Sequence, residues 1–184
     1  IKPGSEGLIA LPYLMGEKTP IWDNNAKAVI FGLALNHSKA HLVRAMMEGV
    51  TYALYESFEI LQKTLAKINY PIVMNEGGAI SKVWREMITD VFNVPTVLVK
   101  NRVGAPYGDW LLAAKAIGHI RDYSIAKEKA EYIEPLEPQK KNNNLYMEYF
   151  KLYKSIYRDI KDRFVDLNQL KEKYYYKSAI KGIR

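Results

Sequence analysis

The segment Ile72–Lys82 constrains the fold of this chain more than any other, because an apolar run leads through two adjacent glycines into a helical pattern. Ile72-Val73-Met74 predicts a short buried strand, and Gly77-Gly78 predicts the turn that leaves it. Ser81 is a residue type that caps helices, and it precedes a helix predicted from Lys82 to Phe92. The side chains predicted to face inward from this helix are Val83, Trp84, Met87, Ile88 and Val91.

A second strand and helix follow this unit directly. Pro95 ends the first helix, and Thr96–Val99 predicts another strand. Gly104–Gly108 reads as a loop, and a helix is predicted from Asp109 to Ile117, closed by Gly118. Strands that alternate with helices in this way predict an α/β crossover unit.

The segment before this unit predicts two strands and a long helix. The strands are expected within Gly7–Leu11 and Val29–Leu33. Ser38 is expected to cap a helix that runs to about Lys67. Its packing face repeats at steps of three and four residues and comprises Leu42, Ala45, Met46, Gly49, Ala53, Leu54, Ser57 and Leu61.

The C-terminal part has a different composition. Residues 130–141 read as a polar linker with two prolines, and a tyrosine-rich amphipathic helix is predicted over about 143–170. Its aromatic side chains are expected to dock onto the domain rather than to form a ligand box, and they are Tyr146, Tyr149, Phe150, Tyr153, Tyr157 and Phe164. The last dozen residues have little to bury, so we expect them to be frayed or held by a partner.

Composition excludes several classes of function. The chain has no cysteine, which excludes disulfides, thiolate zinc sites and cysteine nucleophiles and suits a cytoplasmic protein. No apolar run approaches the roughly 20 residues of a membrane helix, so no membrane partner is expected. The net charge is +7, but basic and acidic residues interleave as on a solvated helix face, which argues against nucleic acid. His37 and His41 lie four residues apart, and we expect capping or packing roles for them rather than a metal site.

The double-glycine turn is suited to binding a nucleotide. Adjacent glycines let a ligand approach the backbone closely and permit backbone angles that a side chain would forbid. The helix that follows offers unpaired N–H groups to an anion. The alternative is an ordinary strand–helix turn without a ligand, and both interpretations stay open at this point. The phosphate-loop, dinucleotide and zinc-helix motifs are all missing from the sequence.

Several motifs together resemble the FGGY family of carbohydrate kinases. The run from Leu11 to Asp23, Leu-Pro-Tyr-Leu-Met-Gly-Glu-Lys-Thr-Pro-Ile-Trp-Asp, and Ala26–Leu33 after it resemble one family segment. The family's Gly-Leu, His-Leu-x-x-Ala and acidic residue are matched by Gly32-Leu33, His41-Leu42, Ala45 and Glu48. Asn75–Ala79 resembles the adenosine loop, and Gly104–Ala113 resembles a late family segment. Lysines stand at positions 18 and 27, where the family usually has arginine.

The resemblance implies an α/β domain of the actin-like ATPase class, which is ribonuclease-H-like: a mixed sheet flanked by helices, with a long C-terminal helix. Residues 1–184 would be one C-terminal domain with its core at about 7–120. The resemblance also implies nucleotide-binding roles for Gly77, Gly78, Ala79, Ser81 and Lys82. The glycines and Ala79 would contact adenosine and the near phosphate, with Lys82 beside the adenine.

The resemblance further implies an ATP-dependent sugar kinase that uses Mg²⁺. Its substrate is expected to be a pentulose such as xylulose, with gluconate second and glycerol third; a non-catalytic nucleotide-binding or oligomerisation module is the competing class. The chain begins at Ile1 and reads as part of a longer protein. The family's catalytic aspartate and phosphate loops belong to segments upstream of this sequence, in and after an N-terminal sugar-binding domain. We therefore expect no catalytic residue, no metal ligand and no kinase activity in this chain alone, and a homodimer through the exposed cleft wall stays open.

Overall fold

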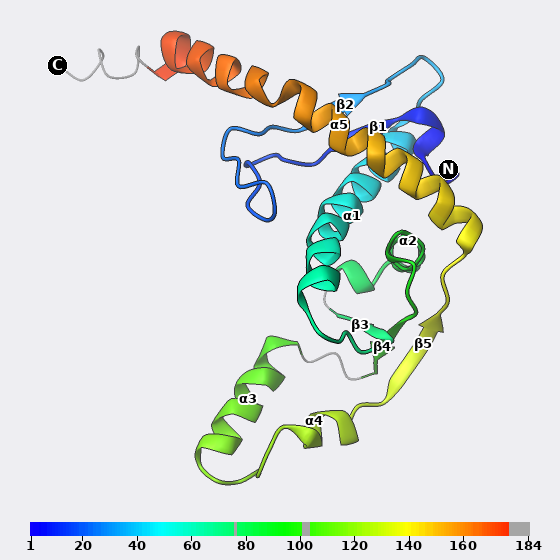
Figure 1. The fold of residues 1–184 in the computed structure, drawn as a ribbon, viewed down its shortest axis with the longest axis vertical. Coiled ribbons are helices and arrows are strands. Elements are labelled where there is room, and N and C mark those ends of the chain that lie inside the picture. Colours follow the sequence, from blue (N-terminus) through cyan, green and yellow to red (C-terminus); the bar gives the residue numbers. More distant parts are fainter. Residues whose placement is uncertain (76, 101–103, 177–184) are drawn as a thin grey trace, which may run out of the picture. The chain divides into compact units, whose positions relative to one another are not determined.

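The computed structural model describes residues 1–75, 77–100 and 104–176 (Figure 1). The chain divides into two compact units, one of residues 1–65 together with the chain from residue 144 onward, and one of residues 66–143. Each unit has its own small sheet. In the described part of the chain, no helix combines the length and the apolarity that crossing a membrane requires.

The first unit pairs two short strands beneath a long helix. Strand β1 (Ile9–Leu11) is fully buried and runs antiparallel to β2 (Val29–Phe31). Helix α1 (Lys39–Thr64) packs against β1, and Ala45 forms a buried cluster with Leu8 and Ala10. A short 3-10 turn, η1 (Ser5–Gly7), precedes β1 and also contacts α1. The strands and the capped helix therefore form where the sequence predicts them.

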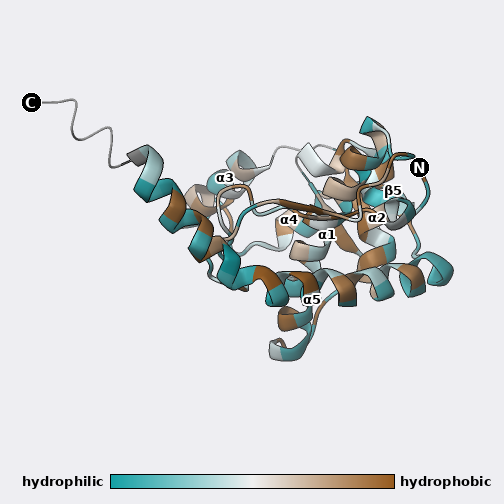
Figure 2. Cartoon of the chain, turned by 90° about the horizontal axis from the view of Figure 1, so that it is seen from above, coloured by the Kyte–Doolittle hydropathy of each residue, from teal (hydrophilic) through white to brown (hydrophobic). Residues whose placement is uncertain are grey.

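Helix α5 (Lys140–Lys171) completes the first unit through an aromatic cluster. Apolar and polar residues alternate along it, as expected of an amphipathic helix (Figure 2). The hydroxyl groups of Tyr13 and Tyr153 are 2.5 Å apart, and the Tyr52 ring lies 5.4 Å from the Tyr153 ring. Burial is complete or nearly so for Tyr146, Phe150, Tyr153 and Phe164. The predicted docking role of these aromatic side chains is confirmed.

The second unit contains a mixed three-stranded sheet. Strand β3 (Ile72–Met74) runs parallel to β4 (Thr96–Val99), and β4 runs antiparallel to β5 (Tyr132–Leu136). Between β3 and β4 lie the 3-10 turn η2 (Gly77–Ala79) and helix α2 (Lys82–Phe92). Because a helix joins the two parallel strands, this is the crossover unit that the sequence predicts.

Polar contacts hold α2 against its neighbours in this unit. The hydroxyl groups of Thr89 and Thr96 are 2.7 Å apart and buried. The Asp90 carboxylate accepts hydrogen bonds from the Gln139 N–H and the Asn142 side chain, both at 2.8 Å. These donors lie at the N-terminal end of α5, where a carboxylate is favoured. Within this unit, Asp90 thus fixes residues 139–142 to the end of α2.

The structure corrects the linker that we predicted over residues 130–141. This segment contains β5 and the beginning of α5. The proline at position 135 obscured the strand, although a proline is tolerated in an edge strand such as β5. The short helix α4 (Ser124–Glu128), which precedes β5, was also missed.

Some helix boundaries and faces also differ from prediction. Helix α3 (Ala105–Ala116) begins inside the predicted loop Gly104–Gly108, because a proline in the first turn costs no hydrogen bond. Three side chains predicted to face inward are exposed, and they are Leu54, Leu61 and Val83. At the C-terminus, Glu172–Tyr176 continues as a π-helical turn, and the rest of the predicted frayed tail lies outside the described residues.

Candidate functional site

The double-glycine bend is open to the surroundings. Gly77 and Gly78 lie in η2, and a Cβ atom built on either one meets no atom of the described residues within 4 Å, chain neighbours aside. Ala79, next along the chain, is buried and anchors the bend. Neither glycine has a positive φ, so neither uses the backbone angles that glycine permits and other residues avoid. The absence of side chains here leaves room for close approach of a ligand to the backbone.

Helix α2 starts directly behind this bend. The Ser81 hydroxyl accepts a hydrogen bond of 3.3 Å from the Trp84 N–H, which confirms its capping role. Lys82 is 70% exposed, and its ammonium group lies 3.9 Å from the Glu86 carboxylate. Such a long, exposed ion pair holds the lysine weakly, so its charge can turn toward an anion at the helix N-terminus.

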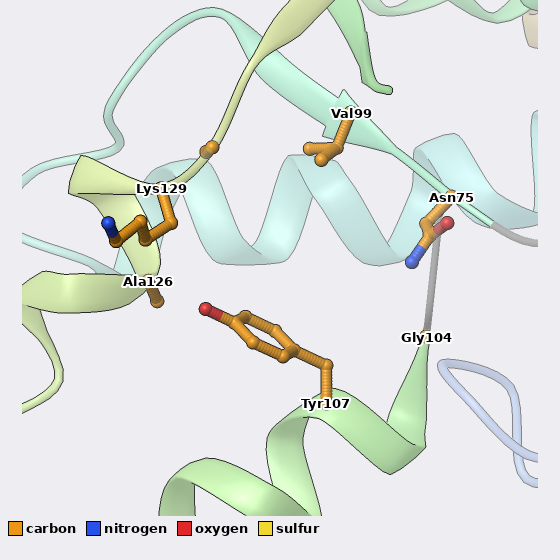
Figure 3. A pocket seen from close by; sticks show the side chains of 7 residues that line it. Asn75, Val99, Gly104, Tyr107, Ala126 and Lys129 are labelled. Atoms are coloured by element: carbon orange, nitrogen blue, oxygen red, sulfur yellow. The ribbon is translucent and has the colours of Figure 1, made fainter. Parts of the chain in front are cut away.

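A cavity lies beside the bend, at the ends of the parallel strands. Its volume is about 320 Å³, and we call it the β3–β4 cavity. It is lined by Asn75, Val99, Gly104, Tyr107, Ala126, Lys129 and Ala130 (Figure 3). Asn75 directly follows β3 and Val99 ends β4, so the cavity lies at the carboxyl ends of both strands. Open α/β sheets bind their ligands at this edge.

The five residues predicted to bind nucleotide all lie within the bend and the first residues of α2. Ser81 is occupied by helix capping, whereas the glycines and Lys82 are accessible. Sequence reasoning missed Asn75 and Tyr107 as lining residues of a cavity. Asn75 carried a usable signal, because a polar residue directly after a buried strand lies at the ligand-binding edge of the sheet. Tyr107 carried none, since it fell in a predicted loop.

Glu48 occupies a buried polar cluster in the first unit. Its carboxylate accepts hydrogen bonds of 2.9 Å from the Gly4 N–H, the Ser5 hydroxyl and the Arg44 guanidinium. Burial raises the pKa of Glu48, while these three donors oppose the rise. Arg44 also donates to the Tyr146 hydroxyl, which connects α1 with α5. Glu48, the acidic residue of the family motif, therefore connects the N-terminal turn to α1, and its partner Arg44 connects α1 to α5.

His41, from the same motif, caps α1. Its Nδ1 atom accepts the Ser38 N–H at 3.1 Å, and its Nε2 atom lies 3.5 Å from the Glu6 carboxylate. The expected capping role is thus confirmed. Among the residues that the structure describes, no group of three or more histidine, aspartate or glutamate side chains could hold a metal ion.

The crossover unit up to α3 and the open bend lie within a stretch of the chain that matches a known protein family. The model of the FGGY family of carbohydrate kinases, C-terminal domain, matches residues 2–117, and the chain belongs to this family. The predicted family is therefore confirmed, and so is the actin-like fold class.

Individual relatives are sugar kinases. The chain is 35% identical to the xylulose kinase of Staphylococcus epidermidis over 90% of its own length and 34% of the relative's. It is 31% identical to the gluconokinase of Bacillus subtilis over 97% of its length and 33% of the relative's. The ligand-bound xylulose kinase from Lactobacillus acidophilus superposes with a TM-score of 0.77 at 32% identity, over 90% of this chain and 34% of that one. The chain spans about a third of the length of these relatives.

Proposed function

We propose that this chain is the nucleotide-binding C-terminal domain of an ATP-dependent sugar kinase, which phosphorylates a hydroxyl group of a pentulose such as xylulose. The observation that carries the proposal is the open bend at Gly77-Gly78, which lies between a strand of the crossover unit and the N-terminus of α2. Membership of a carbohydrate kinase family supports a nucleotide-binding role for the bend.

The proposal assigns specific roles to the residues of the bend. Gly77, Gly78 and Ala79 present the backbone to the nucleotide, because among the described residues a Cβ atom built on either glycine meets no atom beyond its chain neighbours within 4 Å. Ser81 keeps the first turn of α2 in place through its hydrogen bond to the Trp84 N–H. Lys82 adds positive charge where the helix field already favours phosphate. When bound, ATP supplies the phosphoryl group for transfer.

Phosphoryl transfer also needs groups that we do not assign to this chain. The kinase would use Mg²⁺, but the described residues contain no fitting cluster of carboxylates, so we derive no step through the metal. The nucleophile must be oriented and deprotonated by a base held in line with the phosphate. We assign that base, the sugar contacts and the remaining phosphate contacts to the N-terminal part of the full-length protein. The proposal also includes that residues 1–184 form one C-terminal domain and that the protein is cytoplasmic.

Xylulose is the first choice of substrate. The similarity to the Staphylococcus epidermidis xylulose kinase is higher than that to the Bacillus subtilis gluconokinase, 35% against 31% identity. Gluconate is the second choice because the gluconokinase match covers almost the whole chain. Most sugar contacts are assigned to the other domain, so an assay of the full-length protein must decide between the two.

The test is ADP release by the full-length protein with ATP and a panel of xylulose, gluconate and glycerol. We expect the highest kcat/KM with xylulose and no turnover by the 184-residue chain alone. A preference for gluconate would overturn the substrate assignment. Turnover by the isolated chain would overturn the assignment of the catalytic base to the N-terminal part of the full-length protein. If the full-length protein binds ADP but turns over no sugar, it is a non-catalytic nucleotide-binding module instead.

A further inference from the structure

We propose that His37 and His41 form a clasp on the turn at residues 4–7, and that this clasp opens when the two imidazole rings take up protons. The clasp consists of these two side chains and Glu6, the residue that both of them face. All three residues belong to the first unit, whereas the candidate nucleotide site belongs to the second. The inference therefore does not rest on the proposed function.

The turn that the clasp holds has an unfavourable backbone conformation. Four consecutive residues, Gly4 to Gly7, have a positive φ, and two of them, Ser5 at 46° and Glu6 at 53°, are not glycine. Residues with side chains adopt such angles only where the surrounding structure compensates for the strain. The Glu48 carboxylate holds the first half of the turn, and the two histidines contact Glu6.

The two histidines use their ring nitrogens in the same way. Nδ1 of His37 accepts the Ala34 N–H at 3.0 Å, and Nδ1 of His41 accepts the Ser38 N–H at 3.1 Å. On the opposite side of the rings, Nε2 of His37 lies 3.4 Å from the Glu6 carbonyl oxygen. Nε2 of His41 is buried and lies 3.5 Å from the Glu6 carboxylate. Because a ring nitrogen that accepts a hydrogen bond carries no proton, each neutral ring has its proton on Nε2, the atom that faces Glu6.

Protonation removes the hydrogen bonds on which the clasp depends. An imidazolium is a donor at both nitrogens, so Nδ1 can no longer accept a backbone N–H. Ala34 and Ser38 then lose these acceptors, and Ser38 is the N-cap residue of α1. The ring centroids of His37 and His41 are 5.2 Å apart, so two charged rings repel each other. They would also stand at a helix N-terminus, which disfavours cations.

The other charged groups do not cancel this effect. The charged and titratable side chains around the clasp come from η1, α1 and α5, and they are Glu6, Lys39, Arg44, Glu48 and Tyr149. Lys39 lines the same groove as His37, so its charge adds to the repulsion once the ring is charged. Arg44 and Glu48 pair with each other. Glu6 attracts an imidazolium, but its side chain is 46% exposed, which weakens the attraction.

The experiment follows the amide and imidazole signals of the chain by NMR from pH 8 to pH 5, the range in which histidine ordinarily changes its charge. Hydrogen exchange at Ala34 and Ser38, corrected for the intrinsic effect of pH, should become roughly five- to tenfold faster, as expected for the loss of one hydrogen bond. The midpoint of this change should coincide with the titration of the two imidazole rings.

The test variant is the double replacement His37→Gln and His41→Gln. A carboxamide oxygen accepts the same N–H groups at every pH, and Ser-x-x-Gln is a usual capping box, so the response to pH should disappear while the cap stays formed. His119→Gln is the matched control, because His119 is an exposed histidine of the second unit. It should leave the response of Ala34 and Ser38 unchanged. The remaining amide signals show whether each variant is folded.

Three results would overturn the inference. One is that the imidazole signals of His37 and His41 do not titrate between pH 8 and pH 5. Another is that they titrate while hydrogen exchange at Ala34 and Ser38 stays the same. Both are measured on the parent chain and therefore decide the question even if a variant does not fold. The third is a response that persists in the double variant or disappears in His119→Gln.

Discussion

The backbone at Gly49 on α1 lies directly against the carbonyl group of Ala10 on β1. A Cβ atom at position 49 would collide with the Ala10 carbonyl oxygen. Both residues are buried, and the obstacle is backbone rather than a side chain that can turn away. Helix α1 can therefore approach β1 this closely only with glycine at this point.

We expect Gly49→Ala to destabilise the chain by about 2–4 kcal/mol, since the helix must move away from the strand. Urea unfolding measures this change. The matched control is Gly108→Ala on α3, where a Cβ atom meets nothing within 4 Å. That change should stabilise by about 0.5–1 kcal/mol, because alanine favours helix. Equal effects at the two positions would show that close packing of α1 on β1 does not explain Gly49.

A second prediction concerns Arg44, whose guanidinium pairs with the buried Glu48 carboxylate at 2.9 Å. Replacing Arg44 with methionine leaves the carboxylate buried without its cation and removes the donor to Tyr146. We expect a loss of about 2–4 kcal/mol in unfolding free energy. Arg158→Met, at an exposed ion pair, should change stability by less than about 0.5 kcal/mol. A small change in unfolding free energy in Arg44→Met would mean that the hydrogen bonds from Gly4 and Ser5 alone compensate for burial of the Glu48 carboxylate.

A third prediction concerns Glu56. Burial raises its pKa to about 7; Glu59 and Glu17 add to the rise, and Lys154 opposes it. The unfolded chain ionises this carboxyl near pH 4.5, before the folded chain does, so its ionisation costs stability as the pH rises from about 4.5 to 7. Glu56→Gln should equal the parent at pH 4 and be more stable by about 1–2 kcal/mol at pH 8, a value reduced for partial exposure.

Unfolding at both pH values tests this expectation, with Glu59→Gln as the control. Glu59 is partly exposed and paired with Lys154, so its replacement should give a smaller difference between pH 4 and pH 8. A pH-independent effect of Glu56→Gln would contradict the raised pKa.

The sequence predicts the elements that have strong local signals. The strands at 9–11, 72–74 and 96–99 and the capped helices α1 and α2 follow from apolar runs, glycine turns and serine caps. Strand β5 could not be predicted, because its proline and charged residues resemble a linker and only its pairing with β4 makes it a strand. The burial of Glu48 was likewise hidden, since its donors at Gly4 and Ser5 are more than 40 residues away.

The candidate site was also predicted only where its signal is local in the sequence. Gly77-Gly78 is a local pattern, and its open geometry is visible in the structure. Asn75 and Tyr107 line one cavity only because β3, β4 and α3 come together in space. Two lining residues that stand 32 positions apart leave no periodic pattern in the sequence.

The most direct test of the central claim is an NMR titration of the chain with ADP, comparing the parent with Gly78→Trp. If the open bend holds the nucleotide, ADP should shift amide signals at Gly77–Lys82 with a dissociation constant on the order of 1 mM. The indole in Gly78→Trp should fill the space above the bend and abolish these shifts while the rest of the spectrum is preserved. Shifts that persist unchanged in Gly78→Trp, or none in the parent, would contradict the account.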